Sequence, residues 1–94
     1  MFEIKKQEDG AFIVSGRLDA SQADRADKQL NAIEESARLD LGGLDYISSA
    51  GIGVFVKTQL RLQAAGQALK LVNLHPRVRA IFHYAGLEQL FGIE

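Results

Sequence analysis

The chain has 94 residues, of which 11 are basic and 12 acidic, so the formal net charge is −1 at pH 7. This length suits one domain with a modest core, and the balanced charge argues against binding to nucleic acid or an anionic membrane through a global field. The chain lacks cysteine, a signal-peptide core and an apolar run that could insert in a membrane, so we expect a single soluble, cytoplasmic domain over residues 1–94.

The first third of the chain predicts a hairpin followed by a helix. Apolar and polar residues alternate from Phe2 to Lys5, and residues 8–10 are a turn signal. Residues 11–15 then form a second strand, which Gly16 is expected to end. From Asp19 the apolar residues recur at spacings of three and four, which is typical of one face of a helix.

The remaining chain alternates strands with helices. The expected elements are a strand at 37–41, a loop with Gly42 and Gly43, a helix from about Ser49 to Ala65, a strand at 68–74, and a helix from Pro76 to Gly86. Residues 87–91 suit one more short helical turn. The order β-β-α-β-α-β-α predicts an α/β sandwich, with a mixed four- to five-stranded sheet and helices on one or both faces.

The start of the central helix has an unusual composition. Ser48 and Ser49 are both suitable N-cap residues. Gly51 and Gly53 follow within the first turns, although each glycine costs a helix about 1 kcal/mol relative to alanine. We therefore expect a neighbouring strand or another protein to approach this backbone closely.

Three segments in order resemble one family. The central one, residues 46–53 (YISSAGIG) after a strand ending in Asp40, resembles the signature of STAS domains, the anti-sigma factor antagonists of bacteria. Residues 16–19 (GRLD) resemble the turn before the first helix of that family, and residues 71–76 with 85–87 resemble its last third. The resemblance covers nearly the whole chain and implies the same α/β layout.

The resemblance implies a phosphorylation-controlled partner switch. An anti-sigma factor with serine kinase activity binds the unmodified antagonist and then phosphorylates it at the start of this helix. The added charge of roughly −1.5 to −2 expels the kinase, and a serine phosphatase would reset the switch. Phosphorylated members have Asp-Ser-Ser-Gly, but here Ala50 occupies the acceptor column and Ser48 the aspartate column. Ser49, Ser48 or no residue is thus the acceptor.

The expected partner-binding surface includes both helix-start residues and more distant charges. Its members are Asp19, Asp40, Ala50, Gly51, Ile52, Gly53 and Lys57. Asp19 suits an N-cap as well as a contact, and Asp40 suits either hydrogen bonding to loop N–H groups or a role in the site. Lys57 and Arg61 form a small basic edge that is either solvated or opposite an acidic partner.

Catalysis has little support in the sequence. His75 and His83 lie at unlike places, there is no carboxylate cluster, and Gly51-x-Gly53 lacks the rest of a phosphate-binding loop. We therefore expect neither an enzyme nor a cofactor nor a metal site. The alternatives are a non-phosphorylated STAS subunit docked on a transporter or stress-signalling complex, and a small ligand-binding or catalytic domain with a polar pocket in the 40–53 loop. The apolar helix start also leaves a homodimer open.

Overall fold

The computed structural model describes residues 2–93, which form one mixed five-stranded sheet and three α-helices. In chain order the elements are β1 (Phe2–Lys6), β2 (Phe12–Leu18), the 3-10 turn η1 (Ala20–Gln22), α1 (Ala23–Asn31), β3 (Ala37–Ile47), α2 (Ser49–Ala64), β4 (Leu69–Val72), α3 (Pro76–Tyr84) and β5 (Gly92–Ile93). The strands lie side by side in the same order, β1-β2-β3-β4-β5. Only the β1–β2 pair is antiparallel among the described strands, which confirms the predicted mixed α/β sheet.

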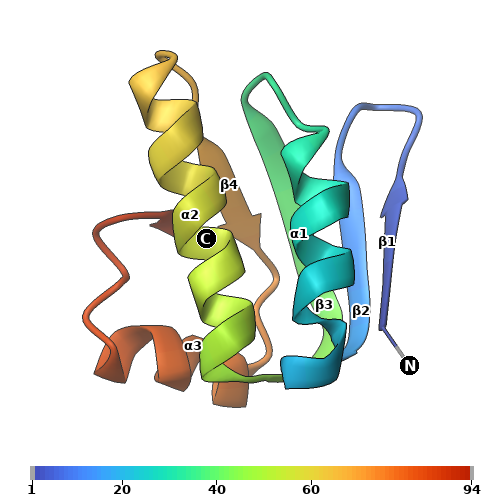
Figure 1. Ribbon diagram of the computed structural model, residues 1–94. Coiled ribbons are helices and arrows are strands. Elements are labelled where there is room, and N and C mark those ends of the chain that lie inside the picture. The colour runs from blue at the N-terminus through green and yellow to red at the C-terminus, as the bar shows by residue number, and fades with distance from the viewer. Residues whose placement is uncertain (1, 94) are drawn as a thin grey trace.

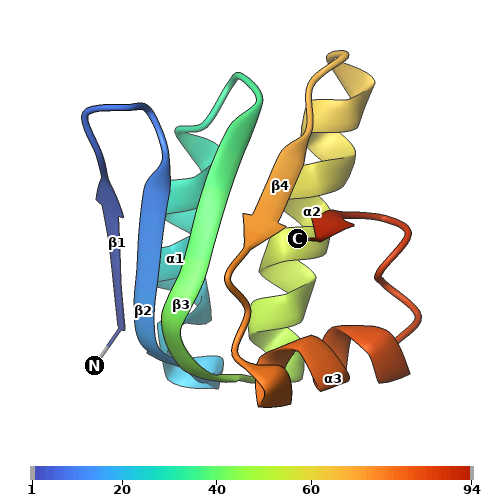
Figure 2. The ribbon, with the colours of Figure 1, turned by 180° about the vertical axis from the view of Figure 1, so that it is seen from behind.

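Two helices cover one face of the sheet. Figure 1 shows α1 and α2 side by side in front of the strands, and Figure 2 shows the opposite face, which they leave open. The core lies between these layers because β3 directs Leu39, Leu41 and Leu44 toward the helices. α3 lies across the end of the sheet near the start of α2, where Phe82 stacks on Phe55 with ring centroids 6.4 Å apart.

Two strands run further than the sequence predicts. β2 continues through Gly16, which has φ +91°, and β3 continues through Gly42 and Gly43, where a loop was expected. The reason is close strand pairing: a Cβ on Gly43 would lie 2.9 Å from the Cβ of Ser15, at a register shift between β2 and β3. Gly43 therefore lets β2 and β3 approach each other and does not end a strand.

The chain end also differs from the prediction. A turn closed by the hydrogen bond from Leu90 N–H to the Leu87 carbonyl oxygen, at 3.1 Å, stands where a helical turn was expected. β5 follows it and pairs with β4. Gln59 of α2 holds this turn, because its Nε2 donates to the Leu90 carbonyl oxygen at 2.8 Å and its Oε1 accepts from Leu69 N–H at 2.7 Å.

We predict that Gln59→Leu destabilises the fold by about 1–3 kcal/mol, because a leucine leaves buried backbone groups unpaired. The Gln59 side chain is 1% exposed, so water cannot replace these bonds. Chemical denaturation measures the free energy of unfolding. Gln63→Leu, an exposed site on the same helix, is the matched control and should change that free energy little; equal losses in both variants would contradict this account.

Candidate functional site

The candidate site forms where β2 and β3 end side by side. Leu18 pairs with Ile47 in the parallel register, and Ser48 N–H donates to the Leu18 carbonyl oxygen at 2.8 Å. Because both strands run in the same direction, the residues after them emerge at the same edge of the sheet. The turn at Asp19 and the start of α2 are therefore neighbours, although they are far apart in the sequence (Figure 1).

The two serines at the start of α2 have different roles. Ser48 is the N-cap: its backbone is extended, with φ −85° and ψ 169°, and its Oγ accepts a hydrogen bond from Gly51 N–H at 3.1 Å. Ser49 is the first helical residue and is exposed. Its hydroxyl makes no hydrogen bond to any residue within 2–93. Of the two, Ser49 thus presents the free hydroxyl at a helix N-terminus, which favours negative charge.

The glycines of α2 have different surroundings. A Cβ on Gly51 would lie 2.7 Å from Leu18 Cγ and 3.0 Å from Ile47 Cγ1, so this glycine allows the helix to lie against the strand ends. A Cβ on Gly53 would meet nothing within 4 Å, because Gly53 faces outward. The close approach expected for both positions therefore occurs within the described fold at Gly51 alone.

Asp19 is held in place by the turn that it caps. Its Oδ1 accepts hydrogen bonds from Ser21 N–H at 3.0 Å and from the Ser21 hydroxyl at 2.6 Å. The hydrogen bond from the Ser21 hydroxyl is the main cause that lowers the pKa of the Asp19 carboxyl, and nearby Arg17 adds to it. Asp19 is therefore ionised at neutral pH and fixes a negative charge at the edge of the candidate site.

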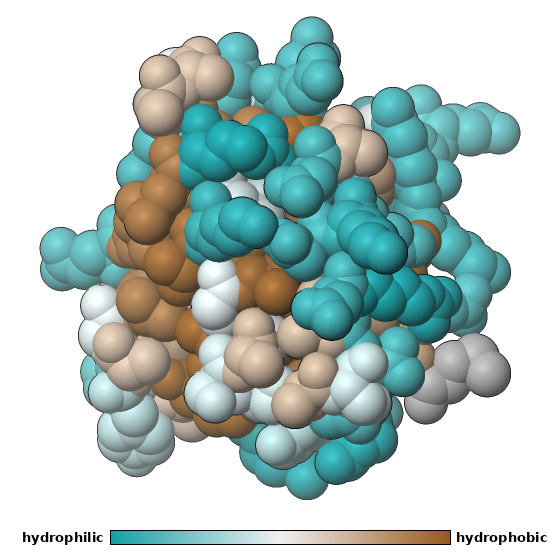
Figure 3. Space-filling model, in the orientation of Figure 1, coloured by the Kyte–Doolittle hydropathy of each residue, from teal (hydrophilic) through white to brown (hydrophobic). Residues whose placement is uncertain are grey.

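The outer side of α2 is largely apolar. Ala50 and Gly53 are exposed, Ile52 and Val56 are partly buried, and the Leu60 side chain is 53% exposed. Figure 3 shows apolar surface on the left-hand side of the molecule, where α2 and the segment that follows α3 lie in Figure 1. An apolar strip that begins beside a free serine hydroxyl is a surface that another protein can cover. We call Ser49, Ala50, Ile52, Gly53 and Val56 the α2 surface.

The structure does not bring Asp40 to this edge. At about 3.3 Å per residue, Asp40 lies roughly 20 Å along β3 from Ile47. Its carboxylate accepts hydrogen bonds from Gly42 N–H at 2.9 Å and from Asn73 Nδ2 at 3.1 Å. Of the two roles left open for Asp40, the geometry favours the structural one.

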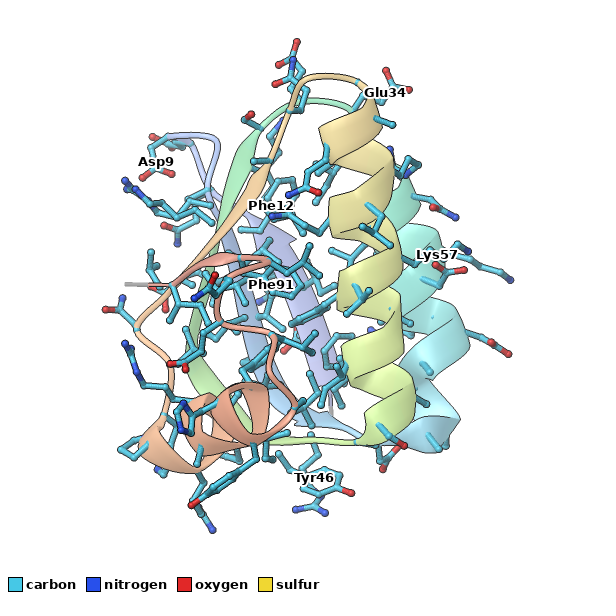
Figure 4. All side chains as sticks on the ribbon, turned by 90° about the vertical axis from the view of Figure 1, so that its left-hand side faces the viewer. Asp9, Phe12, Glu34, Tyr46, Lys57 and Phe91 are labelled. Atoms are coloured by element: carbon cyan, nitrogen blue, oxygen red, sulfur yellow. The ribbon has the colours of Figure 1, made fainter. Side chains whose placement is uncertain are left out.

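The expected basic edge of α2 is directed toward α1. The Lys57 Nζ lies 3.0 Å from Asp27 Oδ2, and Figure 4 shows Lys57 on the outer side of the two helices. Arg61 Nη2 donates to the Leu30 carbonyl oxygen at 3.0 Å. Both cations therefore link the helices, and Lys57 lies on the exposed side of α2 beyond the α2 surface.

Sequence reasoning missed one pair beside the site. The Arg17 guanidinium lies 4.5 Å from the ring centroid of Tyr46, its partner in the β2–β3 register. Figure 4 shows Tyr46 at the end of the sheet where α2 begins. Such a cation–π contact keeps a positive charge near the strand ends. Only the strand register, which depends on the parallel pairing, could have revealed it from the sequence.

The alternative hypothesis of a ligand-binding or catalytic domain required a loop from Asp40 to Gly53. This segment does not form such a loop. It consists of the end of β3 and the start of α2. Within residues 2–93, no group of three or more metal-ligating side chains comes together. None of the helices in that range is both long and apolar enough to cross a bilayer.

Comparison with known proteins identifies relatives over nearly the whole chain. A family model described as "Mlab, STAS domain" matches residues 3–92. BtrV of Bordetella bronchiseptica, which is named as an anti-sigma factor antagonist, is 34% identical over 91 residues, covering 90% of this chain and 78% of that protein. The anti-sigma-B factor antagonist of Bacillus subtilis is 30% identical over 95 residues, covering 97% and 87%.

Solved structures share the fold. The unphosphorylated form of the anti-sigma factor antagonist SpoIIAA has a TM-score of 0.78 at 18% identity, covering 100% of this chain and 88% of that one. The phosphorylated form of SpoIIAA, from Bacillus, has a TM-score of 0.73 at 17% identity, covering 100% and 91%. At these identities the likeness concerns the arrangement of the sheet and helices.

We predict opposite effects of alanine at the two glycines of α2. Gly51→Ala should destabilise the fold by about 1–3 kcal/mol, because its Cβ would overlap the buried Leu18 and Ile47 side chains. Gly53→Ala should stabilise it by about 0.5–1 kcal/mol, because it gains helix propensity without a clash. Thermal and chemical unfolding of both variants measure this difference, and a loss of stability in Gly53→Ala would contradict the open space around Gly53.

Proposed function

Because the chain belongs to the STAS domain family, we propose that it is an anti-sigma factor antagonist, which binds an anti-sigma factor and so regulates sigma-factor-dependent transcription. The names of both relatives and the likeness to SpoIIAA support this function. The protein acts by binding and not as an enzyme. It works in the cytoplasm, where bacterial transcription takes place.

The partner contacts the α2 surface together with the turn at Asp19. The apolar side chains of Ile52 and Val56 supply area to bury, at about 25 cal/mol per Å² removed from water. Gly53 supports this contact because its missing side chain exposes the helix backbone where nothing in the fold needs the space. We leave Asp40 out of the contact, since its carboxylate is engaged with Gly42 and Asn73.

Phosphorylation of Ser49 by the anti-sigma factor, acting as a serine kinase, releases the complex. The observation that carries this step is the exposed, unbonded Ser49 hydroxyl at the N-terminus of α2. A phosphate there adds a charge of roughly −1.5 to −2, which the helix N-terminus favours. The same charge opposes burial of the apolar α2 surface against a partner. A serine phosphatase restores the binding form.

Ala50 supports a second candidate function. It occupies the column that holds the acceptor serine in phosphorylated STAS domains, so this chain departs from their motif. A member without an acceptor suits a permanent subunit of a larger assembly, such as a transporter or a stress-signalling complex. In that case the same α2 surface stays covered and carries no switch.

We predict that Ser49→Ala abolishes phosphorylation and leaves partner binding intact. Purified protein is mixed with the candidate anti-sigma kinases of its host and magnesium-ATP, while intact mass and complex formation are followed. Wild type should gain the mass of one phosphate and leave the complex, whereas Ser49→Ala should stay bound without a mass change. Ser49→Asp should bind at least tenfold more weakly, because it places a charge on the contact surface.

Ser48→Ala is the matched control for the acceptor. It removes the N-cap and should cost about 1 kcal/mol of stability, yet it leaves the Ser49 hydroxyl in place and should still gain phosphate. Loss of phosphorylation in Ser48→Ala alone would make Ser48 the acceptor. Stable binding of wild type without a mass change would favour the permanent subunit, and no binding to any anti-sigma factor would contradict the antagonist function.

A further inference from the structure

β1 leaves one side of its backbone unpaired. It pairs with β2 on one side, and Figure 2 shows no described element beyond it on the other. Gln7 N–H donates to the Ala11 carbonyl oxygen at 2.7 Å, next to the last β1–β2 pair. Because backbone direction alternates along an antiparallel pair, the backbone groups of Glu3 and Lys5 point to β2 and those of Ile4 and Lys6 point outward.

A side-chain contact agrees with this assignment. Arg25 Nη1 of α1 donates to the Phe2 carbonyl oxygen at 2.9 Å. Phe2 is an even-numbered member of the strand, like Ile4 and Lys6, so a carbonyl that is open to a side chain is expected there. The outward edge of β1 therefore offers the backbone groups of Ile4 and Lys6 and the remaining lone pair of the Phe2 carbonyl.

We propose that β1 pairs with β1 of a second copy of this chain, antiparallel about a two-fold axis at Ile4, to form a continuous ten-stranded sheet. In this register Ile4 faces Ile4 of the second copy, and each donates its outward N–H to the other carbonyl oxygen. Phe2 of each copy faces Lys6 of the other and exchanges backbone hydrogen bonds with it in the same way. Glu3 faces Lys5 of the second copy, and symmetry repeats this opposite-charge pair.

Charge complementarity selects this register over its neighbours. In an antiparallel β1–β1 pair, a residue whose backbone groups point outward lies opposite another such residue. The two-fold axis can therefore pass through a residue of β1 but not between two residues. An axis at Glu3 would place Glu3 opposite Glu3, and an axis at Lys5 would place Lys5 opposite Lys5. Directly opposed like charges destabilise a strand pair. The axis at Ile4 alone gives opposite charges, and it also overlaps all five residues of β1.

The pairing also gives partners to charged and apolar side chains that are not fully buried in one copy. The Lys5 Nζ already lies 3.5 Å from Glu3 Oε2 along the same strand, so the two copies together would form a cluster of four alternating charges. The partly buried Ile4 side chains would meet on the helix side of the joined sheet. Five residues of strand form a small interface, so the dimer is weak and reversible. It lies at the opposite edge of the molecule from α2 and does not cover the α2 surface (Figure 1).

Sedimentation velocity of the full chain over a wide concentration range tests this proposal. Wild type should show a reversible monomer–dimer equilibrium. Lys5→Glu places two like-charge pairs across the axis and should weaken the dimer by about tenfold or more. The double variant Glu3→Lys with Lys5→Glu restores opposite charges and should restore the dimer. Arg79→Glu, an equal charge change on exposed α3, is the matched control and should dimerise like wild type.

A backbone variant tests the hydrogen bonds at the axis. Ile4→Pro removes the outward N–H of Ile4 and none of the β1–β2 bonds, so the monomer should keep its circular dichroism spectrum while the dimer is lost. If wild type is monomeric at every concentration, the proposal is wrong. A dimer that persists in both Lys5→Glu and Ile4→Pro would also overturn it, because the contact would then lie elsewhere.

Discussion

The parallel pairing of β2 with β3 is the constraint on which the candidate site depends. The hydrogen bond of 2.8 Å from Ser48 N–H to the Leu18 carbonyl oxygen ends this pairing and fixes where α2 begins. Gly51 then lets the helix rest directly on the side chains of Leu18 and Ile47. A shift in this strand register would separate the Asp19 turn from the serines, because each strand carries one part of the site.

Local signals were enough to predict the start of α2. Ser48 caps its own helix through Gly51, three residues away, so the relevant contact lies within the predicted element. From β1 to α3, the order of strands and helices followed from apolar periodicity in the same way. Even the choice between the serines depends on local geometry, since the capping residue uses its hydroxyl and the next residue does not.

The sequence was less informative wherever a residue depends on a distant partner. Gly43 resembles a loop glycine until Ser15 is placed against it, and Gln59 resembles an exposed helix residue until β4 and the turn at Leu90 lie beside it. Asp40 likewise accepts a hydrogen bond from Asn73, which directly follows the neighbouring strand β4. In each case the deciding contact comes from another element, which a pattern along one segment cannot show.

The order of the strands has a consequence for how the protein is made. Each strand pairs with the strand that precedes it in the chain, because the sheet order is β1-β2-β3-β4-β5. As the nascent chain leaves the ribosome, each strand after β1 emerges when the strand that it pairs with has already been made. Such sequential pairing keeps contacts local and favours fast folding. One edge of the growing sheet is therefore always its newest strand, while β1 stays exposed at the other edge from the beginning.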